Sequence, residues 1–181
     1  MTFKATLICA ALAASPAMSE ATMFEDFSAD PNTRWDYVSD QVMGGVSEGQ
    51  ATVANDGDTR FIRLTGDVST DNNGGFIQVR RLLNGDMPAD MTGLKIKTRG
   101  NGQEYYVHIR TKDSNIPWFY YQATFTAPKD WGDVSIPLDA FKPSNTSLPT
   151  MIEPGKITSL GIVAYGRDHA ADVSVAGIEV F

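Results

Sequence analysis

The segment from Trp35 to Gly49 holds the densest group of reactive residue types in the chain. Its sequence, WDYVSDQVMGGVSEG, contains two aromatic residues, three carboxylates and three glycines. Two carboxylates about 5 to 10 Å apart could hydrolyse a glycoside. The candidates are Asp36, Asp40, Glu48 and Asp71. Aspartates near glycines more often accept hydrogen bonds from the backbone of turns, so a structural role is favoured and the catalytic pair is the alternative.

The sequence lacks the residue patterns that other catalytic mechanisms need. His108 and His169 are the only histidines, and neither has a second histidine or an acidic residue at a zinc-binding spacing. The sequence has no Gly-x-Ser-x-Gly elbow and no phosphate-binding glycine loop, and Gly100-Asn101-Gly102 is short enough to be a turn. We therefore predict no catalytic residue, no metal ligands and a protein that is not an enzyme.

Short β-strands are the elements that would position these residues. From residue 60 onward, apolar and polar residues alternate in short runs, and no long stretch has the 3.6-residue period of a helix. Strands with one buried face are expected near residues 62–68, 76–80, 93–99, 103–111, 118–125, 134–138, 160–164 and 173–180. About nine or ten strands predict an all-β fold, a two-sheet β-sandwich of jelly-roll type, with an immunoglobulin-like sandwich as the alternative.

Two local features follow from the strand pattern. Val173 and Val175 share one parity while Ile178 and Val180 share the other, so a β-bulge at Gly177 would bring all four into the core. The Asn101-Gly102 pair is typical of a tight turn, and it predicts a hairpin between residues 93–99 and 103–111.

Three strands carry unusual residues at the alternate positions whose side chains point away from the core. These are Phe76, Gln78 and Arg80; Glu104, Tyr106, His108 and Arg110; and Trp118, Tyr120, Gln122 and Thr124. In one sheet they would form a face of aromatic rings, amides and guanidiniums, suited to stacking on sugars or to anchoring a protein partner. The alternative is a set of ordinary cross-strand pairs on a solvated face. With the neighbouring loop, the candidate ligand- or partner-binding residues are Asp40, Met43, Gln78, Arg80, Tyr106, His108, Arg110, Tyr120 and Gln122.

The beginning of the chain predicts export. Lys4 is followed by an apolar run from Ala5 to Ala14 and then by small residues, which is the layout of a secretory signal peptide over residues 1–19. We therefore expect one domain over residues 20–181, in the periplasm or secreted, with no membrane-spanning segment after the leader is removed. The net charge of −7 argues against nucleic acid as a partner.

A series of motifs across residues 24–181 resembles the complex I intermediate-associated protein 30 family. The series begins with Trp35 and the segment Asp40–Ser47, and it continues through the Asn-Gly-Gly-Phe motif to Trp131 and an Ile-Pro-Leu motif at residues 136–138. Its motif or structural residues are Trp35, Gly44, Gly45, Ser47, Asn73, Gly74, Gly75, Phe76 and Trp131. The resemblance implies a galactose-binding-like jelly roll, similar to carbohydrate-binding modules.

The same resemblance implies a non-catalytic assembly factor or chaperone for respiratory complex I. The chain would engage a protein partner, a respiratory membrane complex among the candidates, through the Gly-Gly loop and the aromatic-arginine face. The alternative is a carbohydrate-binding module that binds a glycan on this face. The family's mitochondrial setting differs from the exported setting that the leader predicts.

No cofactor is predicted, and calcium is left unassigned. Carbohydrate-binding modules often hold a structural calcium near their first and last strands. Glu25-Asp26 resembles the first half of such a site. Ala176-Gly177 stands where an acidic residue would be expected in the second half, although backbone carbonyls are also calcium ligands.

Overall fold

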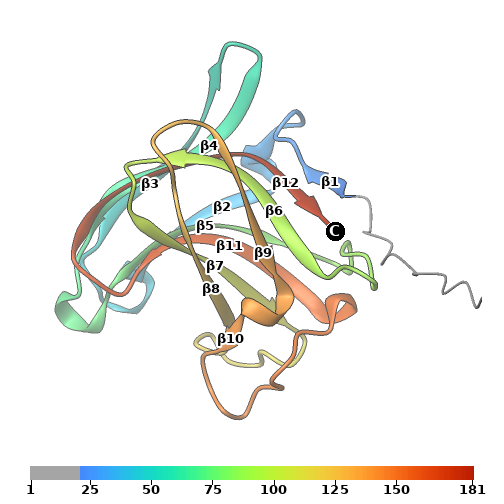
Figure 1. Ribbon diagram of the computed structural model, residues 1–181. Coiled ribbons are helices and arrows are strands. Elements are labelled where there is room, and N and C mark those ends of the chain that lie inside the picture. Colours follow the sequence, from blue (N-terminus) through green and yellow to red (C-terminus); the bar gives the residue numbers. More distant parts are fainter. Residues whose placement is uncertain (1–20) are drawn as a thin grey trace, which may run out of the picture.

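Two six-stranded sheets pack face to face in the computed structural model, which describes residues 21–181 (Figure 1). All strand pairs are antiparallel. Sheet A has the order β3-β4-β12-β6-β9, and β1 also pairs with β12. Its strands are β1 (Thr22–Glu25), β3 (Glu48–Asp56), β4 (Thr59–Val68), β6 (Gly93–Gly100), β9 (Gly132–Pro137) and β12 (His169–Val180).

Sheet B has the order β10-β8-β7-β11-β5-β2. Its strands are β2 (Trp35–Ser39), β5 (Phe76–Leu82), β7 (Glu104–Thr111), β8 (Tyr121–Thr126), β10 (Lys142–Pro143) and β11 (Ile157–Tyr165). The predicted 76–80, 104–110 and 118–124 strands therefore lie in one sheet, with β11 between the first and the second. The last of them begins as a strand only at Tyr121, so Trp118 and Tyr120 belong to the segment before it.

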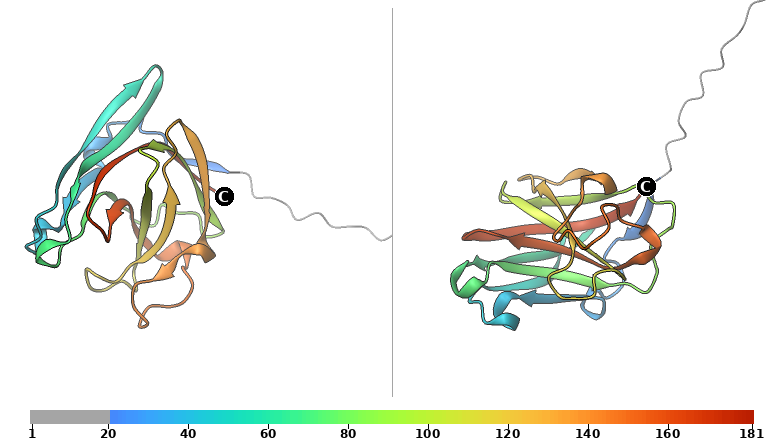
Figure 2. Two further views of the ribbon diagram at one scale, coloured as in Figure 1. Left: turned by 60° about the vertical axis from the view of Figure 1, so that its left-hand side comes forward. Right: turned by 90° about the horizontal axis from the view of Figure 1, so that it is seen from below.

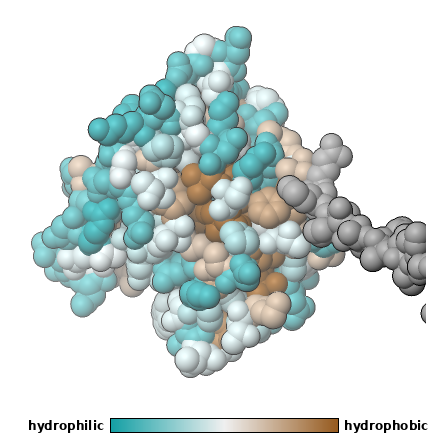
Figure 3. Space-filling view, in the orientation of Figure 1, coloured by the Kyte–Doolittle hydropathy of each residue, from teal (hydrophilic) through white to brown (hydrophobic). Residues whose placement is uncertain are grey.

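The core lies between the sheets and is apolar, because each strand turns alternate side chains inward. Leu64 and Ile178 come from sheet A, Tyr105 and Ile162 come from sheet B, and none of them is more than 1% exposed. Figure 2 shows the two layers from other directions, with the tip of the β3–β4 hairpin projecting beyond them. In the space-filling view of Figure 3, the most apolar residues gather near the middle of the face and hydrophilic residues cover its periphery.

The structure confirms the all-β jelly-roll prediction, and it also confirms the bulge. The register of β12 against β6 shifts between Val175 and Gly177, which leaves Val173, Val175, Ile178 and Val180 all buried. The bulge does not divide β12, which is one continuous strand of 12 residues.

The predicted hairpin between residues 93–99 and 103–111 is wrong. β6 pairs with β12 and β9 in sheet A, whereas β7 pairs with β11 and β8 in sheet B. The Asn101-Gly102 turn therefore crosses from one sheet to the other. Its Asn101 side chain accepts a hydrogen bond from the Tyr105 hydroxyl, and its backbone amide donates to the carbonyl of Asp172. Both strands turn apolar residues toward the same core, a pattern that an inter-sheet crossing and a hairpin share.

The helical segments over residues 21–181 are single 3-10 turns. They are η1 (Pro31–Thr33), η2 (Asp40–Met43), η3 (Asp71–Asn73), η4 (Leu138–Ala140) and η5 (Pro154–Lys156). Accordingly, no helix in this part of the chain reaches the length and hydropathy needed to cross a bilayer. The predicted signal peptide lies outside the described residues.

Candidate functional site

Asp40, at the start of η2, is the centre of a buried cluster rather than a surface ligand. Its carboxylate accepts hydrogen bonds from the amide and hydroxyl of Ser47 at 3.0 and 2.5 Å. It also accepts hydrogen bonds from the amides of Gly75 and Phe76 at 2.6 and 3.2 Å. The side chain is fully buried. Asp40 therefore joins the loop after β2 to the beginning of β5, and we call these four residues the Asp40 cluster.

Glycines make room for this carboxylate. A Cβ atom on Gly45 would lie 2.3 Å from Cγ of Asp40, and one on Gly74 would lie 2.4 Å from its Oδ2. Gly44, at φ +91°, ends η2 in the left-handed region that favours glycine. The signature glycines thus have a packing role and a backbone role around one buried acid.

The electrostatics of Asp40 agree with this structural role. Burial alone would raise its pKa, but the hydrogen bonds from Gly75, Ser47 and Phe76 outweigh burial and lower the pKa below 3.8. Oδ2 accepts three of these hydrogen bonds and Oδ1 accepts one, and the carboxylate has no surface exposed to solvent. This burial gives no support to the prediction that Asp40 binds a ligand, and it makes Asp40 unsuited to a catalytic pair.

Glu25 forms a second buried acidic centre, at the end of β1. Its carboxylate accepts hydrogen bonds from the Phe27 amide at 2.8 Å and from Nε1 of Trp35 at 2.9 Å. It also forms ion pairs with Arg34 and Arg81 at 2.8 and 2.9 Å. Trp35 is therefore buried against Glu25, and its motif or structural role stays a prediction. Two guanidiniums already neutralise Glu25, so these residues do not fit a calcium ion.

The outer face of sheet B contains a groove with a cavity of about 430 Å³. Its floor follows β11, whose outward residues include Ser159 and Gly161. Arg80 of β5 and His108 of β7 both pair with Gly161 in the strand register, one from each side. Because the central strand has small residues where its neighbours have long ones, the sheet is hollowed along β11.

Side chains from several elements form the walls and rim of the groove. Gln78 and Arg80 come from β5, and His108 and Arg110 come from β7. The rim is apolar and exposed: Val42 and Met43 of η2 are 76% and 62% exposed, and Trp118 is 62% exposed. Asn73, Gly74 and Phe76 also line the groove, so the Asn-Gly-Gly-Phe motif contributes to it.

Polar atoms in the groove lack partners. Over residues 21–181, Nε of Arg80 and Nε of Arg110 are buried without a hydrogen bond. His108 and Gln122 form a cross-strand pair, and a hydrogen bond from the Gln122 side chain acts on the pKa of His108 against the effect of burial. Burial lowers the pKa of His108 to about 3, so its imidazole is neutral at physiological pH. Its ring stacks on Tyr120 with centroids 4.2 Å apart. Each unsatisfied buried group is unfavourable by about 1 to 3 kcal/mol, which a bound ligand would offset.

Six of the nine candidate residues meet in this groove: Met43, Gln78, Arg80, His108, Arg110 and Tyr120. Tyr106 and Gln122 lie beside it instead, with Tyr106 packed edge-on against His108 and Tyr165. The sequence analysis did not predict that β11 forms the floor of the groove. The available signal was the outward parity of residues 157–165, where Ser159 and Gly161 interrupt a face of long side chains.

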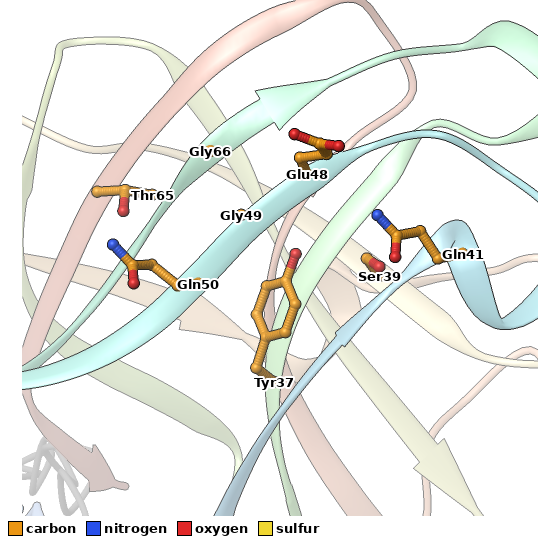
Figure 4. Close-up of a pocket in the computed structure, with 8 residues that line it drawn as sticks. All are labelled: Tyr37, Ser39, Gln41, Glu48, Gly49, Gln50, Thr65 and Gly66. Atoms are coloured by element: carbon orange, nitrogen blue, oxygen red, sulfur yellow. The ribbon is translucent and has the colours of Figure 1, made fainter.

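A second cleft of about 520 Å³ opens between the edges of the two sheets (Figure 4). Tyr37 of β2, whose buried hydroxyl has no partner among the described residues, points toward β3, and Glu48 and Gln50 lie across from it. Gln41 is committed to a hydrogen bond with the carbonyl of Ser47. This cleft has one unpartnered buried group and no cationic or aromatic wall beyond Tyr37, so the groove is the stronger candidate site.

Comparisons with known proteins agree with the fold and with the sequence resemblance. The family model described as Complex I intermediate-associated protein 30 matches residues 24–174, and that prediction is confirmed. A family 11 carbohydrate-binding module of a Clostridium thermocellum cellulosomal cellulase superposes with a TM-score of 0.74 at 14% identity, covering 91% of this chain and 96% of its own.

Two further solved structures share the fold. The family 11 module in complex with a β-1,3-1,4-mixed-linked tetrasaccharide has a TM-score of 0.73 at 15% identity, with 89% of this chain and 95% of that chain covered. A family 30 module from a C. thermocellum cellulosomal cellulase has a TM-score of 0.50 at 16% identity, covering 76% and 91%. A search of curated proteins found no match.

Proposed function

Since this chain belongs to the Complex I intermediate-associated protein 30 family, we propose that it is a non-catalytic binding protein that holds a segment of a protein partner in the sheet B groove. The observation that carries the proposal is the pair of buried, unpartnered arginine Nε atoms on either side of a hollowed strand. A sheet face without a ligand normally satisfies such atoms internally or exposes them to water.

The rim of the groove supports a protein partner. Val42, Met43 and Trp118 expose apolar side chains on both sides of the arginines. Tryptophan, tyrosine, methionine and arginine are the residue types enriched at the centres of protein interfaces. From the family description, the partner would be a subunit or an assembly intermediate of a respiratory membrane complex, met on the exported side of the membrane.

The absence of catalysis is part of the proposal. The signature acid Asp40 is committed to four hydrogen bonds, and His108 is buried, neutral and stacked. No group of three or more His, Cys, Asp or Glu residues suited to a metal occurs in residues 21–181. The groove thus offers recognition chemistry in its arginines, aromatic rings and amides.

Affinity capture with a floor-filling variant would test the proposal. Gly161→Val puts a side chain on the floor, where a Cβ would meet its first neighbour, Oε1 of Gln78, at 3.2 Å. The matched control is Lys97→Gln, an exposed position on β6 of the other sheet. From detergent-solubilised membranes, wild type and Lys97→Gln should enrich the same respiratory-complex subunit and Gly161→Val should lose it. Equal capture by all three proteins would refute the assignment of the groove.

A glycan ligand is the second candidate, favoured by exposed Trp118 and by the fold shared with a module that was solved with a mixed-linked tetrasaccharide. An exposed aromatic ring stacks readily on a sugar. Calorimetric titration with that tetrasaccharide would discriminate between the candidates. Saturable binding that Trp118→Ala and Gly161→Val both abolish would establish the glycan reading, and an absence of heat would remove this ligand.

A further inference from the structure

Arg80 and Arg110 stand on opposite walls of the groove. Arg80 pairs with Gly161 from β5, and Arg110 pairs with Ser159 from β7. Two strand spacings and an offset of two residues along the strands separate their backbones, about 12 Å. Both side chains line the cavity above small residues of β11, so nothing from the central strand stands between them. A single group bound over Gly161 is within reach of both guanidiniums.

These two arginines lack acidic partners, in contrast to four other arginines of the described chain. Arg34 and Arg81 pair with Glu25, Arg63 pairs with Asp172, and Arg99 pairs with Asp56. Within the described part of the chain, neither Arg80 nor Arg110 forms an ion pair, and no Asp or Glu lines the groove. Asp36 is the register partner of Arg80 on β2, yet it makes no ion pair with it.

The local charge therefore opposes the charge of the whole molecule. The chain has a net charge of −7, but its groove contains two positive charges and a neutral imidazole. Burial, and then the positive charge of Arg80, lower the pKa of Arg110. Two like charges placed close together without a counterion are unfavourable in the unbound protein, and an anion between them would remove that repulsion.

Arg110 is also oriented before any ligand arrives. Its Nη2 donates to the carbonyls of Ser114 and Ile116 at 2.7 and 2.8 Å, which fixes the guanidinium plane. Its Nε, like Nε of Arg80, remains without a partner. Because both hydrogens of Nη2 are committed, the Nε–H of Arg110 offers one hydrogen bond to a carboxylate, and the Nε–H of Arg80 can offer a second to the same group.

From these contacts we infer that the groove recognises an acidic peptide segment, in which an Asp or Glu carboxylate binds between Arg80 and Arg110 and apolar neighbours pack on Val42, Met43 and Trp118. The inference rests on the proposed binding function and names its ligand class. A peptide supplies carboxylate and apolar side chains a few Å apart, which this rim and these walls require together. A neutral glycan would leave both guanidiniums uncompensated.

A displayed library of random heptapeptides, selected on the purified protein, would test this inference. Wild type should enrich peptides with Asp or Glu next to an apolar residue. A labelled peptide from that pool should bind about 10- to 100-fold more weakly to Arg80→Gln and Arg110→Gln, since each variant removes hydrogen bonds to a charged group. Replacing the peptide's acid with its amide should cause a similar loss. Lys97→Gln removes the same charge outside the groove and should bind like wild type.

The variants separate this inference from the proposed function. If Gly161→Val abolishes peptide binding while the arginine variants and the amide peptide bind normally, the groove function stands and the carboxylate inference is overturned. If enriched peptides bind Gly161→Val as well as wild type, both fail. Selection of no peptide, together with arginine-dependent binding to a uronic-acid glycan, would overturn the peptide assignment. Thermal unfolding of every variant would show that losses reflect binding.

Discussion

The Asp40 cluster and the sheet B groove lie next to each other, and they treat polar groups in opposite ways. In the cluster, one buried carboxylate accepts hydrogen bonds from three backbone amides and one hydroxyl. In the groove, the buried Nε atoms of Arg80 and Arg110 have no partner within residues 21–181. Both regions depend on glycines, Gly45 and Gly74 in the first and Gly161 in the second.

The Asp40 cluster therefore stabilises the fold, whereas the polar groups of the groove are available to a ligand. A satisfied buried network is worth more than its separate hydrogen bonds and fixes one conformation. Unsatisfied buried groups reduce the stability of the free protein, and they favour binding when a ligand supplies their missing hydrogen bonds. We therefore expect mutations in the cluster to reduce stability and mutations in the groove to reduce binding.

The largest effect should come from Asp40→Ala. Removing the carboxylate leaves the amides of Ser47, Gly75 and Phe76 buried without an acceptor, so the free energy of unfolding should fall by about 4 kcal/mol. Urea unfolding followed by fluorescence would measure the change. Asp40→Asn, which keeps one acceptor oxygen, should lose less. A loss below about 1 kcal/mol for Asp40→Ala would remove the distinction between the two regions.

The next test applies one substitution to both regions. Gly74→Ala would place Cβ 2.4 Å from Oδ2 of Asp40, whereas in Gly161→Ala the nearest atom, Oε1 of the Gln78 side chain, is 3.2 Å away. We expect Gly74→Ala to destabilise by about 3 kcal/mol and Gly161→Ala to change stability by less than about 1 kcal/mol. Thermal melts of the two variants would decide. Equal losses would mean that the floor of the groove is as tightly packed as the cluster.

The pH dependence of stability sharpens the comparison from the groove side. Burial lowers the pKa of His108 from 6.5 to about 3. Between these pH values His108 is protonated in the unfolded chain and neutral in the folded protein. Stability should therefore fall with pH between about 6.5 and 3, by at most about 1.4 kcal/mol per unit. His108→Gln should flatten this slope and recover about 3 kcal/mol at pH 4.5, measured by urea unfolding across pH. Parallel slopes for variant and wild type would contradict the burial of a neutral imidazole.

The smallest effect on stability should come from Arg80→Gln, since Arg80 makes no ion pair in the described chain. We expect a change within about 0.5 kcal/mol, or a slight gain from relieved repulsion with Arg110. The comparison variant is Arg81→Gln, which leaves the buried Glu25 with one guanidinium fewer and should lose about 3 kcal/mol. If Arg80→Gln unfolds as readily as Arg81→Gln, Arg80 is structural and the groove is not a binding site.

The comparison also explains which predictions from sequence were right. The strands, the sandwich and the bulge at Gly177 were predictable, because inward and outward residues alternate along each strand and the parity change at 177 is visible in the sequence. The crossing at Asn101-Gly102 was not, since the same alternation fits two strands of one sheet or of two facing sheets. The outward position of Arg80, His108 and Arg110 follows from the same alternation, whereas the groove itself was not predicted and Tyr120 lies before β8 begins.

By itself, the sequence determined the family, the all-β sandwich and the outward position of the groove's aromatic and cationic residues, since periodicity and motif are local properties of the chain. Only the tertiary structure decided that β11 lies between β5 and β7, which makes Gly161 a floor between two walls. It also decided that Asp40 is enclosed by Ser47 and by Gly75, 35 residues away. Strand order and the partners of a buried acid depend on contacts between distant segments, and the free energy of the whole packed core selects those contacts.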